Sequence, residues 1–123
     1  MSPLSDRKIA WLLFVLAALV YGLTLCRTIY TGDDGDFETA MATLGVCHPT
    51  GYPLFTLLGR AFLLGLAPVI EEPAARVNLM TALFGAGAVA MFYRFVASLV
   101  TARVAATSAT LLLAFAPDRK SVV

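Results

Sequence analysis

The sequence predicts an all-α membrane protein, in which several transmembrane helices accompany short helices at the membrane surface. Of its 123 residues, 59% are hydrophobic and 14% are charged, against about 25% charged residues in an ordinary soluble domain. A core of this size could not hide so much apolar surface from water. The net charge of +1 also argues against a nucleic-acid partner, because phosphates are neutralised by a basic surplus.

Three apolar segments are the predicted spans. The first, about residues 9–25, is uncharged and follows the basic pair Arg7 and Lys8. A signal peptide would have a shorter apolar run and a small-residue cleavage site, so we expect this helix to be retained. The second span, about 77–100, carries glycines and alanines that suit close helix packing. The third, about 104–116, is shorter.

The segment between the first two predicted spans, residues 27–76, has a different character. A short helix is predicted by the helical spacing of four apolar residues, Phe37, Ala40, Met41 and Leu44. Gly45 is expected to end this helix. Residues 54–66 predict a second short helix, with Arg60 reaching for lipid headgroups, although a true span stays open as an alternative. We therefore expect one N-terminal transmembrane piece, 1–123, with an external loop of interfacial helices.

The basic residues predict the orientation of this loop. Arg7 and Lys8 precede the first span, and Arg94 and Arg103 lie between the last two. Lysine and arginine favour the cytoplasmic side of a membrane. Residues 27–76 are therefore predicted to face outward.

Acidic residues directly after the first span are the first candidates for chemistry. Asp33, Asp34 and Asp36 could supply a general base or bind a divalent cation. The alternative is structural, because Asp33 can cap a helix and Asp36 lies three residues later, as in a capping box. The pattern leaves both open.

A turn rich in proline and glycine holds the second group of candidates. His48 could bind a phosphate oxygen or relay a proton, or simply fasten the turn. Tyr52 and Arg60 could hold a lipid-linked phosphate, or anchor the chain at the interface. We predict no zinc site, because Cys47 is the only nearby companion for His48.

Three motifs in order resemble a known family. Asp33–Asp36, Leu44–Leu54 and Arg76–Leu79 are similar to the N-terminus of bacterial multi-pass membrane proteins of unknown function. That family is related to the eukaryotic transmembrane O-mannosyltransferases and is placed with the GT-C glycosyltransferases. The resemblance covers about residues 9–116. The chain departs from the family pattern at Asp36, where glutamate is usual, and at two positions in the second motif.

The resemblance implies a GT-C enzyme in a bacterial inner membrane. It would transfer a sugar from a polyprenyl-phosphate carrier to an acceptor on the outer face. Asp33 would be the base or a carboxylate beside a metal ion, with Asp36 second. His48 and Tyr52 would shape the pocket for the donor phosphate or acceptor. The cofactor stays unknown, with a divalent cation as an option.

The partners implied are membrane lipids, the lipid-linked donor and the further helices of a longer protein. We expect residues 1–123 to be inactive alone, because a donor cavity needs several helical walls. Two alternatives stay open: a transporter or flippase-like component for a lipid-linked substrate, and a small structural membrane subunit. The spans about 9–25 and 77–92 lack charged residues, which weighs against a transporter.

Overall fold

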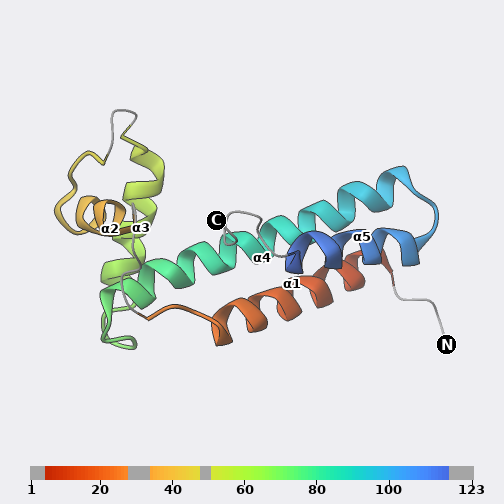
Figure 1. Ribbon diagram of the computed structural model, residues 1–123, viewed down its shortest axis with the longest axis horizontal. Helices are drawn as coiled ribbons and strands as arrows, with labels where there is room; N and C mark the ends of the chain where they lie inside the picture. Colours follow the sequence, from red (N-terminus) through yellow and green to blue (C-terminus); the bar gives the residue numbers. More distant parts are fainter. Residues whose placement is uncertain (1–4, 28–33, 48–50, 117–123) are drawn as a thin grey trace. The chain divides into compact units, whose positions relative to one another are not determined.

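The computed structural model of this chain describes residues 5–27, 34–47 and 51–116 (Figure 1). Within these ranges the structure consists of helices and contains no strand, which confirms the all-α prediction. The helices are α1 (Asp6–Leu23), α2 (Asp34–Thr43), α3 (Pro53–Gly65), α4 (Pro73–Leu99) and α5 (Arg103–Phe115).

Helix α4 is the clearest candidate for a membrane span. Its 27 residues extend about 40 Å at 1.5 Å per residue, which exceeds a hydrocarbon core of about 30 Å. Within the described part of the chain, α4 alone has the length and composition to cross a membrane. Helix α1 carries Asp6, Arg7 and Lys8 in its first turn, and α5 has only 13 residues. Crossing by more than one helix therefore stays a prediction.

The chain forms two compact units, residues 1–21 with 83–123 and residues 22–82. In the first unit, α1 packs with α5 and the later part of α4 around a core that includes Tyr93 and several alanines. Small side chains allow helices to approach closely. The Tyr21 hydroxyl donates a 2.8 Å hydrogen bond to the carbonyl of Ala114. This carbonyl lies in the last turn of α5, where the helix itself supplies no N–H donor for it.

The second unit contains α2, α3 and the first part of α4. Its core is formed by Met41, Leu63, Val77 and Met80, with several phenylalanines packed around them. Helices α2 and α3 touch directly. Gly59 of α3 allows this contact, because a Cβ atom there would lie 2.1 Å from the sulfur of Met41.

The predicted stop of α2 at Gly45 is close to the observed end. The helix ends at Thr43, and Leu44 adopts the left-handed conformation, with φ of 55°. The Gly45 N–H then donates a 3.0 Å hydrogen bond to the Ala40 carbonyl, which is the six-to-one bond of a Schellman motif. Gly45 therefore follows the left-handed residue instead of occupying its position.

Candidate functional site

The turn before α3 fixes the direction of Tyr52. Gly51 and Tyr52 have φ values of 71° and 37°, a region that costs a non-glycine residue about 1–2 kcal/mol. Pro53 follows as the first residue of α3, where its fixed φ suits a helix. The N–H and hydroxyl of Thr56 donate hydrogen bonds of 3.0 and 3.2 Å to the Tyr52 carbonyl. These contacts hold Tyr52 in its unusual conformation.

Tyr52 lies on the wall of a cleft in the second unit. The cleft encloses about 490 Å³, within the range of about 300–1,000 Å³ typical of small-molecule sites. Its aromatic wall has the Phe37 ring 5.7 Å from the Tyr52 ring and 5.6 Å from the Phe55 ring. Polar groups come from Glu38 of α2 and from Asn78 and Thr81 of α4, and Val77 of α4 adds apolar surface.

The first two turns of α4 hold the rest of the second unit in place. The guanidinium of Arg76 donates to three backbone carbonyls, those of Leu63, Ile70 and Glu71, at 2.9, 2.7 and 2.8 Å. The Asn78 side-chain nitrogen donates to the Cys26 carbonyl at 2.9 Å. Arg76 thus closes the connection from α3 to α4, and Asn78 is held in position at the cleft.

Comparison with known proteins identifies the family. The sequence profile of the Protein O-mannosyl-transferase TMEM260 N-terminal domain matches residues 33–117. The chain belongs to this family. Protein O-mannosyl-transferase TMEM260 of Mus musculus is 46% identical over 80 residues, which cover 65% of this chain and 11% of the mouse protein. The protein of the same name from Dictyostelium discoideum is 32% identical over 82 residues, 67% of this chain and 10% of its own length.

The chain therefore spans about a tenth of the length of the curated relatives that it matches. No solved structure is significantly similar to it. The family match confirms the predicted relation to O-mannosyltransferases, whereas the bacterial origin and the GT-C class stay predictions. That match includes all three motifs, from Asp33 to Leu79.

The predicted site residues that the structure describes lie in separate places. Asp33 and His48 lie outside the described residues. Asp36 is exposed on α2 and lines a separate hollow of about 190 Å³ together with Cys47. Tyr52 lines the larger cleft. Arg60 donates a hydrogen bond to the Ala42 carbonyl, so it closes the end of α2.

Glu38 is a cleft residue that the sequence reasoning did not select. Each residue of an α-helix turns by about 100°, so Asp36 and Glu38 point about 200° apart. Glu38 directly follows Phe37, which packs against the core of the second unit, and Asp36 directly precedes it. Each acid lies about 100° from Phe37 around the helix, so helical phase alone could not have indicated which of them borders the cleft.

The described acids do not form a ligand set for the divalent cation considered above. No group of three or more histidine, cysteine, aspartate or glutamate residues comes together within ranges 5–27, 34–47 and 51–116. Asp36 and Glu38 line different hollows. We assign no step to a metal ion.

Proposed function

We propose that this chain is the N-terminal part of a membrane glycosyltransferase of the GT-C type, which transfers mannose to a protein hydroxyl. The observation that carries this proposal is the family match over residues 33–117, because both relatives are named protein O-mannosyl-transferase. The donor in this proposal is mannose linked to a polyprenyl phosphate. The two named alternatives, a transporter and a structural subunit, have no comparable support.

The cleft of the second unit supports a role in binding sugar. Mannose presents apolar C–H faces as well as hydroxyl groups, and the rings of Phe37, Tyr52 and Phe55 offer apolar surface. Glu38 and Asn78 lie at the same cleft and can form hydrogen bonds with hydroxyl groups. A mostly apolar lining with a few placed polar groups is typical of small-molecule sites.

The proposed reaction needs one base and one leaving phosphate. A carboxylate accepts the proton of the acceptor hydroxyl, and the hydroxyl oxygen bonds to the anomeric carbon of mannose. The bond from that carbon to the phosphate oxygen breaks, and the phosphate leaves on its polyprenyl carrier. Asp33 is the first candidate base and Asp36 the second. Glu38 joins them because it lines the cleft.

The distribution of charge and apolar surface supports the proposed membrane setting. Helix α4 crosses the bilayer in this proposal, with residues 27–76 facing outward. Arg7 and Arg94 border the same groove in the first unit, and basic residues favour the cytoplasmic side. The bacterial inner membrane remains our prediction from the sequence motifs. His48, Tyr52 and Arg60 would then meet donor and acceptor outside.

The test is mannose transfer by the intact protein. Membranes containing it are incubated with polyprenyl-phosphate mannose that carries a radiolabel and with a peptide rich in serine and threonine. We expect labelled peptide whose sugar is released by β-elimination. Movement of the donor across vesicles without labelled peptide would instead support the transporter alternative. Absence of both activities would leave the structural alternative.

A further inference from the structure

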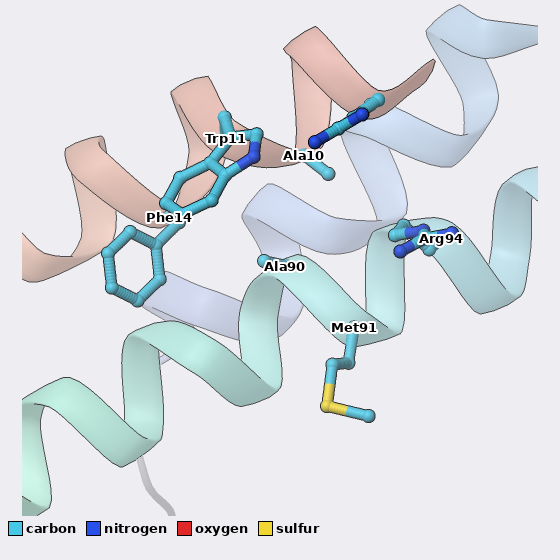
Figure 2. Close-up of a pocket in the computed structure, with 7 residues that line it drawn as sticks. Ala10, Trp11, Phe14, Ala90, Met91 and Arg94 are labelled. Carbon is cyan, nitrogen blue, oxygen red and sulfur yellow. The ribbon is translucent and has the colours of Figure 1, made fainter.

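A second hollow lies in the first unit, apart from the sugar cleft. It is a groove between α1 and α4 that encloses about 560 Å³. Figure 2 shows Trp11 and Phe14 on α1 along one side, with Met91 and Arg94 on α4 along the other. Ala10 and Ala90 lie between the two helices, where their small side chains leave room. We call this hollow the basic groove, because Arg7 also borders it.

The arginines of the basic groove have no partner within the part of the chain that the structure describes. Asp6 is the acid beside them, and its carboxylate already accepts a 2.9 Å hydrogen bond from Arg103. The Tyr93 hydroxyl contacts the same carboxylate oxygen at 3.4 Å. Arg7 and Arg94 are both exposed and form no hydrogen bond or ion pair in the described ranges. The groove thus presents uncompensated positive charge.

The apolar part of the groove continues beneath this charge. Trp11 is 59% exposed and Met91 74% exposed, although both are large apolar side chains. Tryptophan prefers the level of lipid headgroups. In Figure 1, the start of α1 and the end of α4 lie at the same end of the first unit. The basic groove, with its apolar length and two guanidinium groups at one end, matches an amphiphile that has an anionic head.

We propose that the basic groove binds one anionic phospholipid from the cytoplasmic leaflet. Its phosphate lies between Arg7 and Arg94, since guanidinium groups suit phosphate geometry. One acyl chain lies along Trp11, Phe14 and Met91. Basic pockets between transmembrane helices on the cytoplasmic side bind anionic headgroups elsewhere. The proposal rests on the membrane placement proposed above and not on sugar transfer.

The first experiment measures lipid binding by the intact protein. The protein is purified in a neutral detergent and titrated with phosphatidylglycerol, phosphatidylcholine or polyprenyl phosphate, and bound lipid is counted by native mass spectrometry. Because each basic residue contributes about 1 kcal/mol to anionic-lipid binding, Arg7→Gln and Arg94→Gln should each weaken phosphatidylglycerol binding about fivefold. The double variant should weaken it about 25-fold.

Lys8→Gln is the matched control. Lys8 lies in the same first turn of α1 and is exposed, and its replacement removes the same charge. It should weaken binding much less than Arg7→Gln, because Lys8 does not border the groove. Equal weakening by Lys8→Gln would show attraction by general charge and overturn the site. Preferred binding of polyprenyl phosphate, or equal binding of phosphatidylcholine, would overturn the proposed ligand.

The second experiment locates the bound lipid by photolabelling and uses only the wild-type protein. Phosphatidylglycerol with a diazirine on its acyl chain is irradiated in membranes that contain the wild-type protein, and labelled peptides are identified. Labels should concentrate at Trp11, Phe14 and Met91, and labels spread evenly over the exposed faces of α1 and α4 would reject the groove. Mannose transfer is measured on the same membranes. Transfer without lipid labelling rejects this inference alone, and labelling without transfer rejects the proposed enzyme alone.

Discussion

Two acids on α2, only two positions apart, lie in different surroundings. Asp36 borders the small hollow beside Cys47, whereas Glu38 borders the cleft with Tyr52 and Asn78. The difference arises from the turn of the helix and not from the chemistry of the carboxylates. Asp36 and Glu38 lie on either side of Phe37, and the packing of α2 on its neighbours decides which of them borders the cleft.

The first prediction separates these two acids. Glu38→Gln should lower mannose transfer at least tenfold, because a carboxylate at the cleft is a stronger hydrogen-bond acceptor than an amide. Asp36→Asn is the matched comparison, since it makes the same change of charge on the same helix, and it should lower transfer less than Glu38→Gln. Initial rates at several donor concentrations measure both. A larger loss in Asp36→Asn would assign the reacting carboxylate to the other face of α2.

The second prediction concerns Asp33, which precedes α2 in the sequence. Asparagine caps a helix about as well as aspartate, so Asp33→Asn should be silent if the residue only caps. If Asp33 is the base, transfer should fall by about 10²–10⁴-fold, while the protein inserts normally. Mannose transfer and the amount of protein inserted in the membrane are measured for the wild type and for Asp33→Asn. Wild-type transfer would return Asp33 to a capping role.

At the scale of elements, the contact of α2 with α3 depends on a glycine, Gly59, which has no side chain to block Met41. Met41 is fully buried, and its sulfur occupies the space where a Cβ atom of residue 59 would stand. Helix α3 accepts a glycine in its interior, which costs roughly 0.5–1 kcal/mol relative to alanine. The close approach to Met41 offsets that cost through packing.

The third prediction tests this packing. Gly59→Ala should destabilise the second unit by about 1–3 kcal/mol, as overpacked cores usually do. Gly65→Ala, at the last residue of α3, should be neutral or slightly stabilising, because a Cβ atom there has nothing within 4 Å. Hydrogen exchange in α2 and α3 of the intact protein measures the difference. In a Met41→Ala background, Gly59→Ala should cost less than it does in the wild type, because the methionine sulfur no longer fills the space of the new Cβ atom.

The fourth prediction concerns the connection from α3 to α4. Arg76 holds three carbonyls with one planar guanidinium, and a lysine ammonium does not have the spread to reach all three. Arg76→Lys should therefore raise amide exchange over residues 66–72 and lower stability by about 1–3 kcal/mol. Arg94→Lys, the same change at an exposed position of the other unit, should leave exchange over residues 66–72 unchanged. Equal exchange in both variants would contradict this role.

At the scale of the whole molecule, the fifth prediction concerns orientation in the membrane. Thr31→Cys should react with an impermeant maleimide in intact cells, because residues 27–76 are predicted to face outward. Cys26 is exposed, so the experiment uses a Cys26→Ser background. Thr101→Cys, between α4 and α5, should react only after the membrane is opened. The reverse pattern would invert the orientation.

The sequence by itself determined the helical class, the two short helices before α4 and the relation to O-mannosyltransferases. Uncharged apolar runs and helical spacing are local properties, and they were sufficient for α3, which was predicted over 54–66 and observed over Pro53–Gly65. The three motifs were likewise visible without coordinates, and the family match covers the residues that contain them. Their spacing did not reveal which side chains meet.

Only the tertiary structure decided how the described residues of those motifs are arranged. Arg76 and Asn78 contact carbonyls from distant residues, and Glu38 borders the cleft because α2 packs on α3 through Met41 and Gly59. Arg7 and Arg94 share a groove although 87 positions separate them. Sequence patterns fix each helix and its faces locally, whereas these pairings depend on which faces pack together, since side-chain volume and close approach are properties of two helices at once.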